Sequence, residues 1–227
     1  MKTIKVNKDL HYKYNIENSK KEVSKVSAYD IEKYFKIINN YKKNINYKNI
    51  NVICLASRTG REIDLFRIFH LNKFYFFLIK IFERKKYGFN SFPFNFLLKN
   101  YITDIKRDNK GRSIFMGIEL NKERKRKDTL NISFDEIPDE YKDKFDICFF
   151  NSLDHSKSPK LTAKNIKKIT KKNGYIIITF PTGQDSNIVD PTSNVKEKDI
   201  KELFGKSIIY KKKKGSKWSY DEYIIKK

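Results

Sequence analysis

The amino-acid sequence predicts an α/β fold built on a mainly parallel β-sheet. Short apolar runs alternate along the chain with segments of helical periodicity, which is the pattern of strands connected by helices. The runs at 145–150 and 175–180 are almost continuously apolar. Strands of this kind are buried on both faces, so we expect helices on both sides of the sheet. The chain is long enough for one well-cored domain, and we expect residues 1–227 to form it.

The beginning of the chain divides into a polar segment and a helix. Residues 1–26 are polar and weakly patterned, and we interpret them as an N-terminal arm or loop with no assigned function. Ser27 then stands three residues before Asp30, as in a capping box at the start of a helix. Apolar residues recur at helical spacing from Ile31 to Tyr41. This spacing predicts an amphipathic helix of about four turns.

A strand, a tight turn and a helix follow. Residues 51–55 form a short apolar run, the small residues of 56–60 indicate a turn, and helical periodicity begins at Arg61. The same alternation continues, with strands expected at 113–120, 130–134, 145–150 and 175–180 and a helix at 160–172. The last expected elements are a short helix and a closing β-hairpin, at 195–204, 207–210 and 220–225.

An insertion separates the first two expected strands. It spans residues 71–111, and its part 74–101 holds 11 of the 33 aromatic residues. We therefore expect a hydrophobic element here. It would serve as a lid over a substrate, as a contact with another copy of the chain or a membrane surface, or as extra helices packed on the sheet edge. The sequence leaves these alternatives open.

The chain carries a large positive charge. Its 50 Lys and Arg residues against 27 Asp and Glu residues give a net charge of +23, which favours polyanions such as nucleic acid, phosphorylated glycans or anionic lipid. However, 42 of the 50 basic residues are Lys and only three residues are Ala, a bias typical of an AT-rich genome. A selected basic face and a mutational bias both explain the charge.

The cysteines and the apolar runs indicate the compartment. Cys54 and Cys148 lie in apolar runs, and with three scattered histidines they offer neither a disulfide framework nor the spacing of a metal site. We expect buried free thiols. The first ten residues lack the apolar stretch of a signal peptide, and the longest apolar runs fall far short of the ~20 residues of a membrane span. We expect no transmembrane segment and a cytoplasmic location, or the host cytoplasm if the source is a virus.

Polar residues at the ends of predicted strands carry the candidate chemistry. The turn at 56–60 leads into a helix, where backbone N–H groups bind anions, although a plain connection has the same pattern. Glu119 ends the second strand, where a carboxylate accepts hydrogen bonds from ribose hydroxyls in nucleotide-binding sheets, although surface Glu residues are also common there. A rival register ends that strand at Glu83. The polar run 151–156 follows the strand at 145–150.

The order and spacing of these groups resemble the class I S-adenosylmethionine-dependent methyltransferases, especially a small subset with Gly-Ala-Arg-x-Gly in motif I and Asn-Ser-x-Asp-His after the fourth strand. Four segments look like motif I, the acidic end of the second strand, motif IV and the approach to the fifth strand: residues 52–60, 117–121, 145–155 and 171–180. The resemblance covers about residues 48–69 and 112–227. It implies a Rossmann-like methyltransferase fold with a mainly parallel seven-stranded sheet, and S-adenosyl-L-methionine as the cofactor.

The resemblance also implies the site residues. The expected cofactor-binding residues are Leu55, Ala56, Ser57, Arg58, Thr59, Gly60, Glu119, Leu120, Ser133, Phe134, Asn151 and Ser152. Of the two registers, the one that ends at Glu119 fits the family better. Asp154 and His155 are the candidate catalytic residues, because an imidazole with a pKa near 6.5 suits a general base and a carboxylate orients it or the substrate. In the alternative, Asp154 caps the turn and His155 packs beside the cofactor.

Several positions depart from the family pattern. Cys54 stands in place of the usual motif I acid, and Ala56 and Arg58 stand in place of two glycines. Arg58 is expected in the subset, and Ala56 is a mild change where the backbone is not at positive φ. Ser133 replaces the acid of the third strand, and its hydroxyl together with the Phe134 ring would hold the adenine.

The predicted function is S-adenosylmethionine-dependent methyl transfer to an anionic or sugar-like small acceptor, with RNA as a further candidate. Two basic clusters, at 122–127 and 211–217, are placed to attract a substrate with phosphate or carboxylate groups, although lysine runs of this kind are usually solvated loops. The alternative is a catalytically inactive methyltransferase-like protein that binds RNA or an anionic surface through its lysines.

Overall fold

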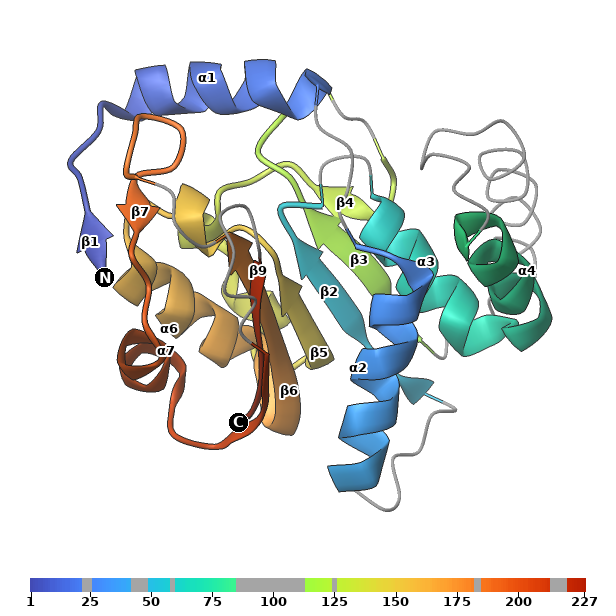
Figure 1. Ribbon diagram of the computed structural model, residues 1–227. Coiled ribbons are helices and arrows are strands. Elements are labelled where there is room, and N and C mark those ends of the chain that lie inside the picture. Colours follow the sequence, from blue (N-terminus) through green and yellow to red (C-terminus); the bar gives the residue numbers. More distant parts are fainter. Residues whose placement is uncertain are drawn as a thin grey trace.

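The computed structural model contains a twisted seven-stranded sheet with strand order β4-β3-β2-β5-β6-β9-β8 (Figure 1). It describes residues 1–21, 26–41, 49–57, 60–84, 113–123, 126–181, 185–212 and 220–227. In the order of the sheet, the strands are Thr129–Leu130, Phe115–Ile118, Val52–Leu55, Phe145–Phe150, Thr170–Pro181, Tyr220–Lys226 and Ile208–Lys212. The first five are parallel, whereas β9 is antiparallel to both β6 and β8. The predicted α/β class, the mainly parallel sheet and the closing hairpin are confirmed.

Helices cover both faces of the sheet (Figure 1). On one face lie α2 (Ala28–Tyr41) and α3 (Arg61–Leu71), with α4 (Lys73–Arg84) packed against them. On the other face lie α6 (Pro159–Ile169) and α7 (Glu197–Phe204). Short 3₁₀ turns connect strands and helices, among them η2 (Phe134–Glu136), η3 (Asp139–Tyr141) and η4 (Leu153–His155). None of the helices in the described ranges combines the length and the apolarity needed to cross a membrane.

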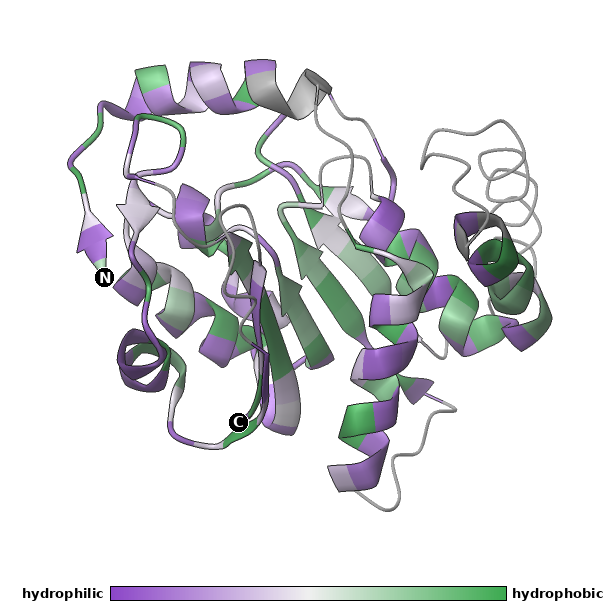
Figure 2. Cartoon of the chain, in the orientation of Figure 1, coloured by the Kyte–Doolittle hydropathy of each residue, from purple (hydrophilic) through white to green (hydrophobic). Residues whose placement is uncertain are grey.

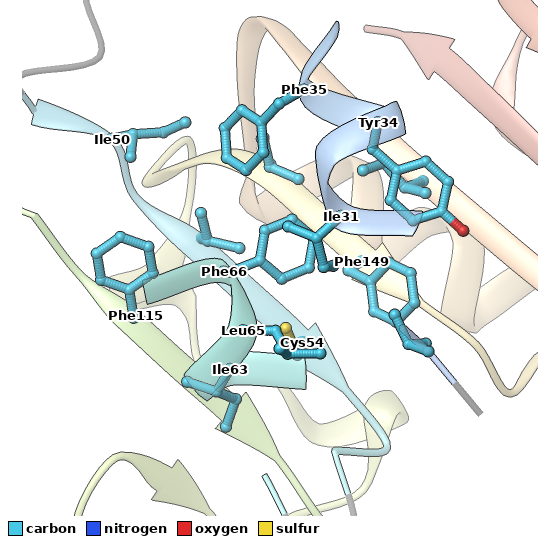
Figure 3. Close-up of a cluster of buried hydrophobic side chains, with 14 of the residues drawn as sticks. Ile31, Tyr34, Phe35, Ile50, Cys54, Ile63, Leu65, Phe66, Phe115 and Phe149 are labelled. Atoms are coloured by element: carbon cyan, nitrogen blue, oxygen red, sulfur yellow. The ribbon is translucent and has the colours of Figure 1, made fainter. Parts of the chain in front are cut away.

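The central strands are buried on both faces, which explains their continuous apolar runs (Figure 2). On the α2–α3 face, Phe149 of β5 lies 5.7 Å from Phe66 and 6.1 Å from Tyr34, measured between ring centroids (Figure 3). Burial of each such side chain stabilises the fold by roughly 1.5–3 kcal/mol. Cys54 and Cys148 are buried free thiols, as predicted, and burial raises the pKa of both.

The N-terminal segment differs from the predicted arm. Residues Lys2–Thr3 form strand β1, which pairs with β7 (Thr192–Ser193), and Lys8–Lys21 form helix α1, which crosses the carboxyl ends of the sheet strands (Figure 1). The helix is polar along most of its length and has no apolar stripe (Figure 2). The Asn7 side chain accepts hydrogen bonds from the first turn, and β1 anchors the segment. Tertiary contacts, which periodicity does not reveal, stabilise α1.

Three further boundaries differ from the predictions. The helix expected up to residue 172 ends at Ile169, because the chain from Thr170 onward joins β6. The short strand expected at 130–134 is only Thr129–Leu130, since Ser133 begins the turn η2. In the insertion, α4 is an amphipathic helix with Phe74 and Phe77 exposed by 67% and 57%. Residues 85–111 of the insertion lie outside the described part of the chain.

Candidate functional site

The parallel strands bring their carboxyl ends to one edge of the sheet, and residues of the predicted site follow four of them. Ala56 follows β2, Glu119 follows β3, Ser133 follows β4 and His155 lies just after β5. Helix α1 lies across this edge and covers it (Figure 1). In open α/β sheets, ligands bind in the crevice at this edge. The structure therefore brings most of the predicted site residues to one place.

The cavity at this edge has two adjoining chambers. The smaller chamber, of about 50 Å³, is lined by His11, Asn15, Ala56, Glu119, Leu120, Phe134 and His155. The larger, of about 430 Å³, is lined by Lys8, His11, Tyr12, Leu120, Lys122, Asn131, Ile132, Ser133, Phe134, Asp135, Glu136, His155, Ser156, Lys157 and Thr162. Four residues line both: His11, Leu120, Phe134 and His155. The volume of the larger chamber falls in the range typical of small-molecule sites.

The turn after β2 is held tightly against β3. The Ser57 amide donates to the carbonyl of Ile118, and the Ser57 hydroxyl packs where a side chain at position 117 would lie: a Cβ on Gly117 would come within 2.4 Å of it. Gly117 is therefore required by close approach. Gly60, with φ 76°, begins α3 in the left-handed region that glycine prefers. Arg58 and Thr59 lie outside the described residues.

We predicted that alanine at position 56 is a mild change if its backbone is not at positive φ. The structure does not meet this condition. Its φ is 58°, so the residue occupies the left-handed region. For a residue with a Cβ this conformation costs roughly 1–2 kcal/mol relative to ordinary backbone. Alanine at this position is therefore strained.

Glu119 lies where the preferred register puts it. Strand β3 pairs with β2 in parallel, with Ile118 opposite Leu55, so Glu119 stands next to the turn at Ala56. Its side chain is buried, and its carboxylate accepts a hydrogen bond of 2.9 Å from the Asn121 amide. The rival Glu83 is in α4 and forms an ion pair of 2.6 Å with Arg61. The register that ends at Glu83 is wrong.

The residues after β5 are arranged differently from one another. The Asn151 amide group donates to the Glu62 carboxylate of α3 at 3.3 Å, and the Ser152 hydroxyl donates to Asn151 at 3.2 Å. Asp154 is buried in η4 and does not line either chamber, whereas the neighbouring His155 lines both. His155, and not Asp154, is thus the member of the predicted pair that faces the cavity.

Asp190, which the sequence did not indicate, contacts His155. Nδ1 of His155 lies 2.8 Å from Oδ1 of Asp190 and 3.2 Å from the carbonyl oxygen of Val189. Asp190 is 35 positions further along the chain, in the loop before β7. No motif or periodicity marks this loop.

Helix α1 supplies further residues that sequence reasoning missed: Lys8, His11, Tyr12 and Asn15. His11 is almost fully buried. Burial, together with the positive charge of Lys157 and the proximity of His155, lowers the pKa of His11 to about 4. The imidazole is therefore neutral at physiological pH.

The remaining predicted residues have mixed placements. Phe134 and Ser133 line the larger chamber, but the Ser133 hydroxyl also accepts a hydrogen bond from the Asp135 amide. Leu55 is fully buried in the apolar core. Of the two basic clusters, Lys122 lines the larger chamber and Lys211 forms an ion pair with Glu197. Residues 124–125 and 213–219 lie outside the described part.

Arg126 departs from the expected solvated basic cluster. Its guanidinium forms ion pairs with Asp64 and Asp128, and these carboxylates raise the pKa of Arg126. This residue is committed to a network within the protein.

No protein-family model matches the sequence, and no curated protein matches it either. Solved structures do. A SAM-dependent methyltransferase from Aquifex aeolicus is 13% identical, with a TM-score of 0.50 over 92% of this chain and 98% of that one. The 1,6-didemethyltoxoflavin-N1-methyltransferase of Burkholderia thailandensis, solved with 1,6-didemethyltoxoflavin and S-adenosylhomocysteine, is 9% identical, with a TM-score of 0.56 over 99% and 93%. The chain therefore has the fold of S-adenosylmethionine-dependent methyltransferases.

Proposed function

We propose that this protein binds S-adenosyl-L-methionine and transfers a methyl group to an anionic or sugar-like small acceptor. The observation that carries the proposal is the position of Glu119. Its buried carboxylate lines the chamber beside the turn at Ala56, at the edge where strands β2 and β3 end. A carboxylate at this position of a nucleotide-binding sheet accepts hydrogen bonds from two ribose hydroxyls.

The surrounding residues fit the rest of the cofactor. Phe134 lines both chambers and offers a ring face to an adenine, with Ser133 next to it. When bound, the cofactor supplies an activated methyl group on a sulfonium centre. The protein's own contribution is to align the acceptor and exclude water.

The acceptor is proposed from the charge and chemistry of the larger chamber. Lys8, Lys122 and Lys157 line it, and their ammonium groups attract phosphate or carboxylate groups of a substrate. His155 lines both chambers and is the candidate general base for the acceptor. RNA remains a further candidate acceptor.

Residues 74–101 are a candidate contact for another copy of the chain or a membrane surface.

Thermal unfolding with added ligand tests the proposal. A ligand that binds only the folded state stabilises it by about 2.7 kcal/mol at 100 times its Kd, which for a chain of this size raises the midpoint by roughly 5–10 °C. We expect S-adenosylmethionine and S-adenosylhomocysteine to give such a shift. Glu119→Ala should abolish it, whereas Glu123→Ala, which removes an exposed carboxylate from the same loop, should retain it.

The contrary result is also specific. If neither compound shifts the midpoint at millimolar concentration, the proposed function is wrong. RNA binding that falls steeply with salt would then support the inactive, lysine-dependent alternative.

A further inference from the structure

The contact between His155 and Asp190 fixes which nitrogen of the imidazole carries the proton. Nδ1 of His155 lies within hydrogen-bond distance of two oxygens, Oδ1 of Asp190 at 2.8 Å and the Val189 carbonyl at 3.2 Å. A backbone carbonyl only accepts, and an ionised carboxylate only accepts. Nδ1 is therefore the donor. In the neutral ring, Nε2 then carries the lone pair.

The loop that presents Asp190 is ordered by its own hydrogen bonds. The Asn187 side chain accepts from the amides of Val189 and Asp190, at 2.8 and 2.9 Å, and the Asn187 amide donates to the Asp190 carbonyl. On the other side, the amide of His155 donates to the carbonyl of Ser152 within η4. Both partners are thus held by hydrogen bonds within their own segments before any ligand binds, as a positioned catalytic group requires.

We propose that Asp190 is a positioning residue, which holds His155 in the Nδ1–H form so that Nε2 removes a proton from the methyl acceptor. This rests on the proposed function. It also limits the acceptor to a hydroxyl group or a nitrogen that carries a hydrogen. In the step, the acceptor's proton moves to Nε2, and its electron pair forms the new bond to the methyl carbon. The carbon–sulfur bond breaks and leaves its electron pair on sulfur. Asp190 then faces the imidazolium that forms.

A shared metal ion explains the same cluster less well. One ligand atom from each of Asp154, His155 and Asp190 lies within 4.8 Å of the others. However, two ligands of one tetrahedral ion, each about 2.1 Å from it, lie roughly 3.4 Å apart. The distance of 2.8 Å between Nδ1 and Oδ1 is that of a hydrogen bond with a charged partner.

Other charged and titratable groups lie near His155. Asp154 precedes it in η4, His11 faces it from α1, and Lys157 lies two residues further along. The remaining titratable residues that line the two chambers with it are Lys8, Tyr12, Glu119, Lys122, Asp135 and Glu136. A variant that changes only Asp190 leaves all of these groups in place.

Imidazole ¹⁵N NMR of the whole chain tests the proposal without an acceptor. The chain has three histidines, so His11→Gln and His70→Gln assign the signals. We expect His155 to be protonated at Nδ1 above its pKa. In Asp190→Asn, which retains the shape and a hydrogen-bond acceptor, we expect the pKa of His155 to fall by about one pH unit because a carboxylate charge is lost. Asp185→Asn, the same change in the same loop, should leave that pKa unchanged.

Three results would overturn the proposal: a proton on Nε2, an equal effect of Asp190→Asn and Asp185→Asn, or displacement of the Nδ1 proton by equimolar Zn²⁺. Thermal unfolding with S-adenosylhomocysteine separates this from the proposed function. Asp190→Asn should retain the wild-type shift. If the wild-type protein shows no shift, the proposed function and the acceptor class fail together, whereas a normal shift with a proton on Nε2 refutes the role of Asp190 alone.

Discussion

The guanidinium of Arg126 donates two hydrogen bonds to the carboxylate of Asp64, at 2.8 and 3.1 Å. Arg126 also pairs with Asp128, so the loop between β3 and β4 is tied to the first turn of α3. The same guanidinium lies against Gly60: a Cβ there would come within 2.5 Å of Arg126 Cζ. The positive φ favours glycine at the start of α3, and a side chain there would also displace the Arg126 guanidinium.

Loss of this ion pair should destabilise the protein strongly. Arg126→Met keeps the aliphatic stem, and among the described residues the buried Asp64 then retains only the longer ion pair with Arg67, at 3.3 Å. Removing one partner of a buried pair costs about 3 kcal/mol or more. Urea unfolding should show this loss, whereas Lys127→Met, at an exposed neighbouring position, should change the free energy of unfolding by less than ~0.5 kcal/mol. Equal losses in the two variants would contradict the buried network.

Asp128 should contribute a stability that is lost in acid. Burial alone would raise its pKa, but hydrogen bonds from Arg126 and Arg67 lower it to about 2. Since the unfolded value is about 3.9, the contribution is complete above that pH and is lost as the pH falls towards 2. The difference in unfolding free energy between wild type and Asp128→Asn should therefore shrink by roughly 1–2 kcal/mol between pH 5 and pH 2. A constant difference would show that the pKa is not lowered.

Replacement of Ala56 by glycine should behave unlike other alanine-to-glycine changes. At φ 58° the methyl group is strained, and its removal relieves about 1 kcal/mol, which offsets the greater freedom of glycine in the unfolded chain. Ala163→Gly, inside helix α6, is the control and should cost about 1 kcal/mol or more. We expect Ala56→Gly to be neutral or slightly stabilising in urea unfolding. A loss as large as that of Ala163→Gly would argue against the left-handed conformation.

Protonation of His11 should release helix α1. Burial lowers the pKa of His11 to about 4, below the unfolded value of about 6.5, so the folded state binds fewer protons between these values. The stability that depends on neutral His11 is complete above pH 6.5 and falls by roughly 2 kcal/mol as the pH drops towards 4. Amide hydrogen exchange should show α1 losing protection in this range while α2 keeps it. His11→Gln, which does not titrate, should remove the pH dependence of α1 protection. An unchanged dependence in this variant would show that His11 is not its cause.

The sheet could be predicted because burial on both faces leaves a direct mark in the sequence. Runs such as 145–150 and 175–180 are apolar for that reason, and the position of Glu119, directly after β3, follows from the same pattern. The amino-acid sequence alone does not exclude the register in which the second strand ends at Glu83. The structure excludes it because Lys73–Arg84 form helix α4, whereas Phe115–Ile118 form the strand that pairs with β2.

The rest of the site depends on contacts between distant segments. His11 belongs to a polar helix with no apolar stripe, which contacts with distant parts of the chain stabilise. Asp190 reaches His155 through a loop whose sequence has no recognisable motif. The positive φ at Ala56 is a backbone property that the alanine side chain does not signal. Local patterns carry no information on any of these three features.

Strand β1 pairs with β7, and Thr3 contacts Thr192 across 189 positions of the sequence. During synthesis, β1 has no partner until β7 has left the ribosome, by which time strands β2 to β6 have all emerged. Helix α1, which β1 anchors, therefore docks late, and the nascent sheet presents an open crevice. Because contacts of such long separation form slowly, we expect the cavity to be completed after the sheet has formed.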